Sequence, residues 1–205
     1  MPSDNQPEQA LPYIDPAIGE TLVEADLTVY NRYFGISVIL PGDTWLYELE
    51  NLGLFETDFP VLDELASTTY GEGSLVYSLV DMALDRGGSG NYCRVVMAVE
   101  NIEGVESLED FVVILSRRLV LTSVNTDYQI FFEGSRQVTM DTVSYQLLTF
   151  TETQAGQDTY TYEVYARELQ DAFLTVVLFY NADELGGTGQ AVGHSYLETG
   201  IAYLA

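Results

Sequence analysis

The two side-chain types that most often do covalent chemistry occur once each in this chain, as Cys93 and His194. A cysteine nucleophile needs a base beside it, so the fold would have to bring the two together. Cys93 stands close to Val95 and Met97, a pattern typical of an interior strand, so we expect a buried cysteine. His194 lies two positions from Val192, about 200° around a helix, so we expect it to face water. A cysteine–histidine pair is therefore not predicted.

Carboxylates are far more numerous, with 32 Asp and Glu against seven Arg and no Lys, and the formal net charge is −25. A glycosidase needs two carboxyl groups at a defined separation, but so many acids produce a pair by chance. The charge argues against nucleic acid and anionic lipid as partners, because both call for cations on the protein. A halophilic source and an extracellular protein with an acidic face both fit this composition.

Metal ligands are not grouped in the sequence. A zinc site takes about three or four nitrogen or sulfur ligands, which a single histidine and a single cysteine do not supply. Calcium takes about six to eight oxygen ligands, and the best candidates are Asp81, Asp85 and Asn91, near a predicted hairpin tip that lacks an EF-hand pattern. We expect neither a metal nor another cofactor, and no catalytic residues.

Asp81 stands in mid-strand between apolar neighbours, and Arg94 lies across the predicted hairpin from it. A cross-strand ion pair is the simpler interpretation, and a carboxylate of a functional site is the alternative. Three of the 15 tyrosines, Tyr160, Tyr162 and Tyr165, crowd one predicted strand. Tyrosines with acids nearby can bind proteins or sugars, although Tyr also fills sheets with its hydroxyl at the rim. These five residues are the candidate binding face.

The strand that carries these tyrosines belongs to a predicted antiparallel meander. Residues 143–151, 160–167 and 172–180 are rich in β-branched and aromatic residues, and short polar links join them. The third segment is apolar on both faces, so we expect it in the middle of a sheet with cover on each side.

Two amphipathic helices are predicted to supply that cover. The first begins at Ser107 and runs to about Leu121, with Asp110 at the spacing of a capping box. Arg117 and Arg118 fall near its end, where we expect them to be solvated and to complement the helix dipole. The second helix begins at Thr188 and is expected to close the chain at about residue 204.

Two hairpins are expected before the meander. Residues 75–84 and 92–99 form the first, across a Gly-rich tip at residues 86–90. Residues 128–132 and 137–140 form the second, which feeds the strand at residue 143.

Nearer the N-terminus, residues 21–29 are expected to form an edge strand, and residues 36–40 a strand that ends at Pro41. Trp45 is expected to plug one end of the core, and residues 61–65 to form a short helix.

The length of 205 residues and a hydrophobic content of 47% suffice for one large domain. We expect a flexible tether at residues 1–20, which contain four Pro, and a single α+β domain at residues 21–205. No apolar stretch reaches the roughly 18 residues of a membrane span. The tether lacks the features of a signal peptide. One hypothesis is that a signal peptide or lipid anchor has been removed, which a signal peptide in the full-length gene would support.

Three stretches resemble the PsbP-like, or Mog-type, α/β sandwich superfamily over residues 27–205. They are YFGIS at 33–37 with LPGDTW at 40–45, ENI at 100–102 followed by the helix start SLEDF at 107–111, and the meander that ends in a helix. The resemblance implies a central antiparallel sheet of about six or more strands flanked by helices. It also implies a noncatalytic role, since known members are partner-binding subunits and many bacterial members look like lipid-anchored secreted proteins of unknown role. It carries over no functional residue.

The function predicted from the sequence is a noncatalytic, extracytoplasmic binding or assembly module, extracellular or at the cell surface, that recognises a protein or a glycan. Two alternatives stay open: a hydrolase that uses paired carboxylates, and a structural surface protein without a ligand. A cleft with two carboxyl groups within reach favours the hydrolase, and a shallow aromatic patch favours binding.

Overall fold

The computed structural model describes residues 28–31, 36–42, 45–52, 75–88, 92–124, 126–140, 142–156, 158–169, 172–182 and 188–203. The predicted tether at residues 1–20 and the predicted short helix at residues 61–65 lie outside these ranges, as do residues 21–27 of the predicted edge strand.

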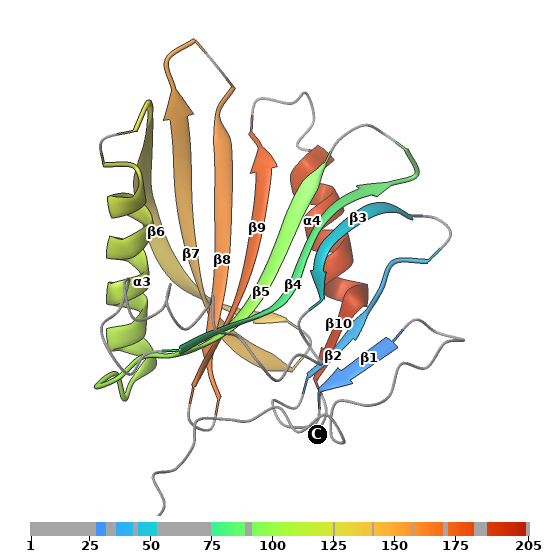
Figure 1. Ribbon diagram of the computed structural model, residues 1–205, viewed down its shortest axis with the longest axis horizontal. Helices are drawn as coiled ribbons and strands as arrows, with labels where there is room; N and C mark the ends of the chain where they lie inside the picture. The colour runs from blue at the N-terminus through green and yellow to red at the C-terminus, as the bar shows by residue number, and fades with distance from the viewer. Residues whose placement is uncertain are drawn as a thin grey trace, which may run out of the picture.

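An antiparallel sheet of seven strands forms the body of the fold, in the order β3-β4-β5-β9-β8-β7-β6 (Figure 1). The strands are β3 (Trp45–Leu52), β4 (Leu75–Arg86), β5 (Cys93–Asn101), β6 (Tyr128–Met140), β7 (Val143–Gln154), β8 (Tyr160–Glu168) and β9 (Phe173–Asn181). The doubly apolar strand β9 lies in the middle, which confirms its predicted place. The α+β class with a central antiparallel sheet and flanking helices is confirmed as well.

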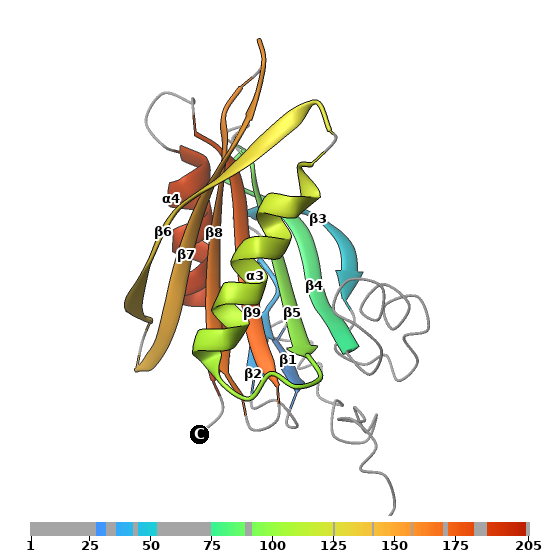
Figure 2. The same ribbon diagram turned by 90° about the vertical axis from the view of Figure 1, so that its left-hand side faces the viewer.

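Helices α3 (Leu108–Thr122) and α4 (Thr188–Gly200) cover opposite faces of this sheet; in Figure 2, α3 lies in front of the strands and α4 behind them. The Ser107 side chain caps α3 as predicted, because its hydroxyl oxygen accepts the backbone N–H of Asp110 at 3.1 Å. Glu109 and Asp110 place negative charge in the first turn, where the helix dipole favours it.

Strand β9 explains the two-sided core. Leu174, Val176 and Leu178 pack into the core beneath α4, and Phe173 packs with the core beneath α3. The Phe173 ring stacks on Phe111 of α3 with 4.3 Å between ring centroids. Each fully buried side chain of this kind stabilises the fold by about 1.5–3 kcal/mol. The mid-sheet position therefore follows from the absence of a polar face on β9.

A second sheet, in the order β1-β2-β10, packs on the α4 side. Its strands are β1 (Thr28–Asn31), β2 (Ile36–Ile39) and β10 (Ile201–Tyr203). The Tyr196 hydroxyl of α4 donates to the carbonyl oxygen of Ile39 at 2.9 Å. The prediction that the last helix runs to residue 204 is wrong, because α4 ends at Gly200 and the chain continues as β10 along β2.

Two strands differ from expectation. The predicted hairpin at residues 128–140 is wrong: β6 is one strand of 13 residues, with a bulge between Phe132 and Gly134 in its pairing with β7. Gly134 has a φ of 151°, which a residue with a side chain rarely adopts, so the glycine marks a bulge where the sequence suggested a turn. Strand β3 was not predicted. Its first residue, Trp45, packs against the core as expected, with its ring edge-on to Tyr196.

Candidate functional site

Strand β8 sends alternate side chains to the two faces of the sheet, and each face carries a distinct group of polar or aromatic residues. Glu163 and Tyr165 lie on the face covered by α4. Tyr162 lies on the other face, with the core beneath α3. Because successive strand residues alternate, the tyrosines predicted to act together are divided between two surfaces.

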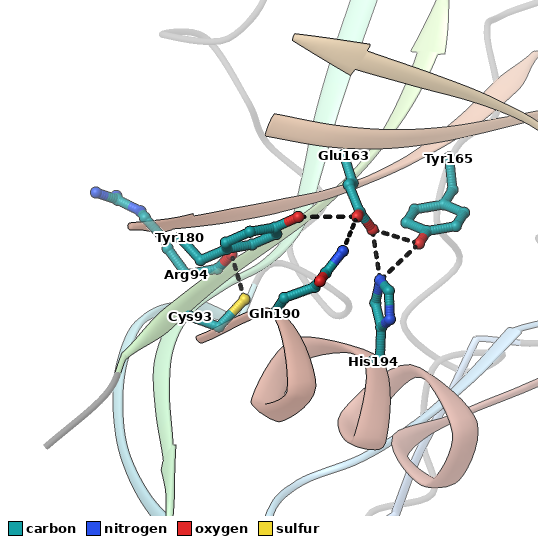
Figure 3. A network of polar contacts seen from close by, with 7 residues as sticks. All are labelled: Cys93, Arg94, Glu163, Tyr165, Tyr180, Gln190 and His194. Carbon is teal, nitrogen blue, oxygen red and sulfur yellow. Dashed lines mark hydrogen bonds and ion pairs between the residues drawn. The ribbon is translucent and has the colours of Figure 1, made fainter. Parts of the chain in front are cut away.

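On the α4 face, the carboxylate of Glu163 accepts four hydrogen bonds (Figure 3). The hydroxyls of Tyr165 and Tyr180 donate at 2.7 and 2.8 Å from β8 and β9. The Gln190 amide donates at 2.8 Å from α4. The Nε2 atom of His194, one turn further along α4, lies 2.5 Å from Glu163 Oε2. The carboxylate therefore ties α4 to two neighbouring strands.

The charges of this network reinforce each other. Burial acts to raise the pKa of Glu163, but the four hydrogen bonds, led by that of His194, outweigh it and hold the pKa at about 2. The same hydrogen bond raises the pKa of His194 above its ordinary value of 6.5, against a burial that acts to lower it. Glu163 is thus an anion at neutral pH, and His194 keeps its proton to a higher pH than a free histidine.

The prediction that His194 faces water is only partly right, because the partly exposed ring also makes this contact. Its side chain is 43% exposed and is paired with a carboxylate that is only 8% exposed. Helical periodicity could not reveal the partner, because Glu163 reaches the helix from a strand 31 residues earlier. The one sequence signal is the spacing of Gln190 and His194, which are four positions apart and so share a helix face.

Cys93 is buried with 0% exposure beneath α4, as predicted. Burial raises the pKa of its thiol to about 12, and the thiol donates to the carbonyl oxygen of Arg94 at 3.6 Å. A thiol in this setting holds its proton and is out of reach of solvent, so it does not supply a nucleophile at neutral pH.

A pocket of about 180 Å³ opens beside the His194 ring, between β6 and α4. Its polar side is formed by Arg136, Tyr165, His194 and Glu198. Its apolar side is formed by Val138, Met140, Leu147 and Leu197. Sequence reasoning missed the pocket because the bulge in β6 decides which residues of that strand face α4.

On the α3 face, the predicted ion pair between Asp81 and Arg94 is present. Arg94 donates from Nε and Nη2 to the two carboxylate oxygens of Asp81, each at 2.8 Å, and a second bond from Nη2 reaches Glu50 on β3 at 2.7 Å. Asp81 lies diagonally across from Arg94, because its direct partner on β5 is Val96. The geometry matches the simpler interpretation of these two residues.

The same face carries a row of aromatic residues that continues from strand to strand into Arg94. In the register of the sheet, the row runs through Phe132, Phe150, Tyr162, Phe179 and Arg94, from β6 to β5. Ring centroids are 5.2 Å apart between Phe132 and Phe150, and 4.6 Å apart between Tyr162 and Phe179. We call these five residues the aromatic row.

Four of the five residues of the candidate binding face gather around this row. Tyr162 and Arg94 belong to it, Tyr160 stacks on Phe179 at 4.9 Å, and Asp81 holds Arg94. Tyr165 does not join them, because it lies on the α4 face, where it bonds Glu163. The sequence missed Phe132 and Phe179, which only the strand register connects to the tyrosines.

A second buried acid, Glu100, lies on the α3 face and bonds Thr175 at 2.9 Å and Arg118 of α3 at 2.8 Å. Burial raises the pKa of Glu100 to about 7, and the hydrogen bond from Thr175 acts in the opposite direction. Arg118 was expected to be solvated, but its side chain is only 26% exposed because it reaches inward to this acid. Glu100 and Glu163 lie on opposite faces of the sheet, so these two acids cannot act on one substrate.

The candidate calcium residues do not assemble into a site within the described residues. Asp85 is buried in β4, and Asn91 lies outside those residues. Across the part of the chain that the structure describes, there is no group of three or more His, Cys, Asp or Glu side chains placed to hold a metal ion. In the same part, neither helix is long and apolar enough to cross a membrane.

Comparison with known proteins finds no matching family model and no matching curated protein. Among solved structures, the chain is similar to cyanobacterial PsbP (CyanoP) from Synechocystis sp. PCC 6803, with a TM-score of 0.46 and 11% sequence identity. The similarity covers 82% of this chain and 86% of that one.

Proposed function

We propose that this protein is a noncatalytic, extracytoplasmic binding module that engages a protein partner through the two exposed ends of the aromatic row, Phe132 and Arg94. The observation that carries the proposal is that the row crosses five strands on one face, from the exposed Phe132 to the ion-paired Arg94, with the buried Phe150 fixing Phe132 from below. Aromatic residues and Arg are the side chains enriched at the centres of protein interfaces.

The β6 end of the row presents apolar surface to solvent. Phe132 is 45% exposed although it is a large apolar residue. Leu121 and Val124, at the end of α3 and just beyond it, are also exposed, and the chain leads from there into β6. Exposed apolar residues that gather near one edge of a sheet are a feature of protein interaction sites.

Charge indicates what kind of partner fits. Acids surround the row: Glu50 and Asp81 bond Arg94, and Glu152 accepts the Tyr162 hydroxyl. With a net charge of −25 on the whole chain, a partner with a basic rim around an apolar centre is favoured electrostatically.

The favoured partner is a protein and not a glycan, because the most exposed ring of the row, Phe132, carries no polar group. The hydrolase alternative gains no support from Glu100 and Glu163, two of the three buried acids in the described residues, because they lie on opposite faces of the sheet.

The test places a photo-crosslinking amino acid at residue 132 in the full-length protein within its own host cells. Residue 131 is the matched control, since Phe131 is 48% exposed on the same strand and its side chain points to the opposite face. We expect a discrete protein adduct from position 132 that position 131 does not give. In purified protein, Arg94→Gln should weaken capture of the same partner.

Equal adducts from both positions, or none from position 132, would contradict the proposal. An adduct that contains carbohydrate and no peptide would favour a glycan partner.

A further inference from the structure

We propose that the pocket between β6 and α4 binds a small carboxylate with a short apolar tail, the carboxylate on Arg136 and His194 and the tail on the apolar side. This inference is independent of the proposed function, because the pocket and the aromatic row lie on opposite faces of the sheet.

The pocket brings together two of the few cationic side chains of this protein, beside one acid of its own, Glu198. Arg136 is one of only seven basic residues, and His194 is the sole histidine. Among the described residues, Arg136 has no ion-pair partner, whereas Arg94 and Arg118 each hold a carboxylate. An unpaired guanidinium beside an imidazole presents several N–H donors in the geometry that suits a carboxylate.

The second ring nitrogen of His194 is available to such a ligand. Nε2 is occupied by Glu163 and lies 3.3 Å from the Tyr165 hydroxyl. Figure 3 shows the other nitrogen on the side of the ring away from Glu163. Because Glu163 is held as an anion by four donors, the imidazole is fixed in orientation before any ligand arrives.

The apolar side sets the size and shape of the tail. Val138, Met140, Leu147 and Leu197 line it, and all four belong to the core on this face or pack against it. A volume of about 180 Å³ corresponds to roughly six waters at about 30 Å³ each. A branched acid of roughly eight non-hydrogen atoms fills a space of this size.

Two classes of ligand carry a carboxylate and an apolar tail, amino acids and short fatty acids, and Glu198 in the pocket lining can distinguish them. An amino acid such as leucine would place its ammonium group on Glu198, while a simple fatty acid would leave Glu198 in water. Both ligands have a carboxylate and an apolar tail, so the experiment compares the binding of an amino acid with that of a fatty acid.

The experiment follows amide and side-chain NMR shifts of the full chain at pH 6 during titration with 4-methylpentanoate, leucine and the neutral 4-methylpentanamide. We expect 4-methylpentanoate to move the signals of Arg136 and His194, and the amide to bind at least about tenfold more weakly. Tighter binding of leucine would assign the pocket to amino acids, and tighter binding of the acid would assign it to short fatty acids.

Variants make the test specific. Arg136→Gln should weaken 4-methylpentanoate binding at least about tenfold. Arg117→Gln is the control, because Arg117 is an equally exposed arginine on the α3 side and should leave binding unchanged.

The pH dependence gives a separate readout. The charged and titratable groups that face His194 are Glu163 and Tyr165 from β8, Arg136 from β6 and Glu198 from its own helix. Of these, Glu163 keeps its charge across the neutral range. Binding should therefore weaken as the pH rises through the pKa of His194.

The proposal is overturned if the neutral amide binds as tightly as the acid, if Arg136→Gln leaves binding unchanged, or if no signal near the pocket moves.

Discussion

The Nε2 atom of His194 lies 2.5 Å from the Oε2 atom of Glu163, so one helix turn of α4 is joined to the centre of the sheet through an ion pair. Three further donors, from Tyr165, Tyr180 and Gln190, complete the shell of the carboxylate. Breaking such a shell costs more than the loss of one surface contact, because the donors that remain are partly buried and unsatisfied.

Replacing Glu163 with Gln should therefore lower the free energy of unfolding by about 2–4 kcal/mol at pH 7. Urea denaturation followed by circular dichroism measures the change. Glu133→Gln, at an exposed acid on β6, should change it by less than about 0.5 kcal/mol. Equal effects of the two variants would show that the shell adds nothing to stability.

The Glu163–His194 pair also predicts a pH dependence with two limits. The pKa of His194 is raised above 6.5, so its contribution is complete below that pH and is lost as the pH rises through the folded-state pKa. The pKa of Glu163 is lowered from 4.5 to about 2, so its contribution is complete above 4.5 and is lost as the pH falls toward 2. NMR titration of the His194 ring should give a midpoint above 6.5, and Glu163→Gln should lower it. A midpoint at or below 6.5 in the unaltered protein would contradict the pairing.

Gly193 provides a test of how closely α4 packs on the sheet. A methyl group there would lie 2.6 Å from the Cys93 sulfur and 3.0 Å from Leu178 Cδ1. Gly193→Ala should destabilise the protein by about 1–3 kcal/mol, although alanine is the better helix former by about 1 kcal/mol. Thermal or urea unfolding measures the loss.

Because the closest atom is the Cys93 sulfur, Cys93→Ala should relieve part of this clash. The double variant should be less destabilised than the sum of the two single variants by at least about 0.5 kcal/mol. If the effects of the two variants are strictly additive, the destabilisation by Gly193→Ala does not come from contact with the sulfur.

Cys93 itself should resist thiol reagents in the native protein. The thiol is fully buried and its pKa is raised to about 12, so modification requires opening of the structure. Labelling with a chromogenic disulfide reagent should be at least about a thousandfold slower than in urea-unfolded protein. Fast labelling without denaturant would point to a reactive cysteine and reopen the nucleophile hypothesis.

The sequence predicted those parts of the fold that local pattern decides. The doubly apolar segment at residues 172–180 had to lie in mid-sheet, and Ser107 with Asp110 had to begin a helix, because hydrophobic periodicity and capping act over a few residues. The link between Asp81 and Arg94 could also be predicted, since both lie on one hairpin.

The parts that the sequence did not predict depend on register or on distant contacts. Gly134 looked like a turn, and only pairing with β7 makes it a bulge. Tyr165 looked like a neighbour of Tyr162 along the strand, yet an odd spacing sends it to the other face. Gly200 ends α4 early because β2 offers the next three residues a partner. His194 gave no sign of its carboxylate, which lies 31 residues away in the chain.

The aromatic row has one further consequence. Its rings are borne by four adjacent strands that hydrogen bonds lock together, and the Arg94 end is held by two carboxylates. Such a platform loses little conformational entropy on contact, unlike a loop that must become ordered. A partner would therefore bind there with little rearrangement of the backbone. The heat-capacity change of binding should then match the apolar area that is buried, with no added contribution from folding of a loop.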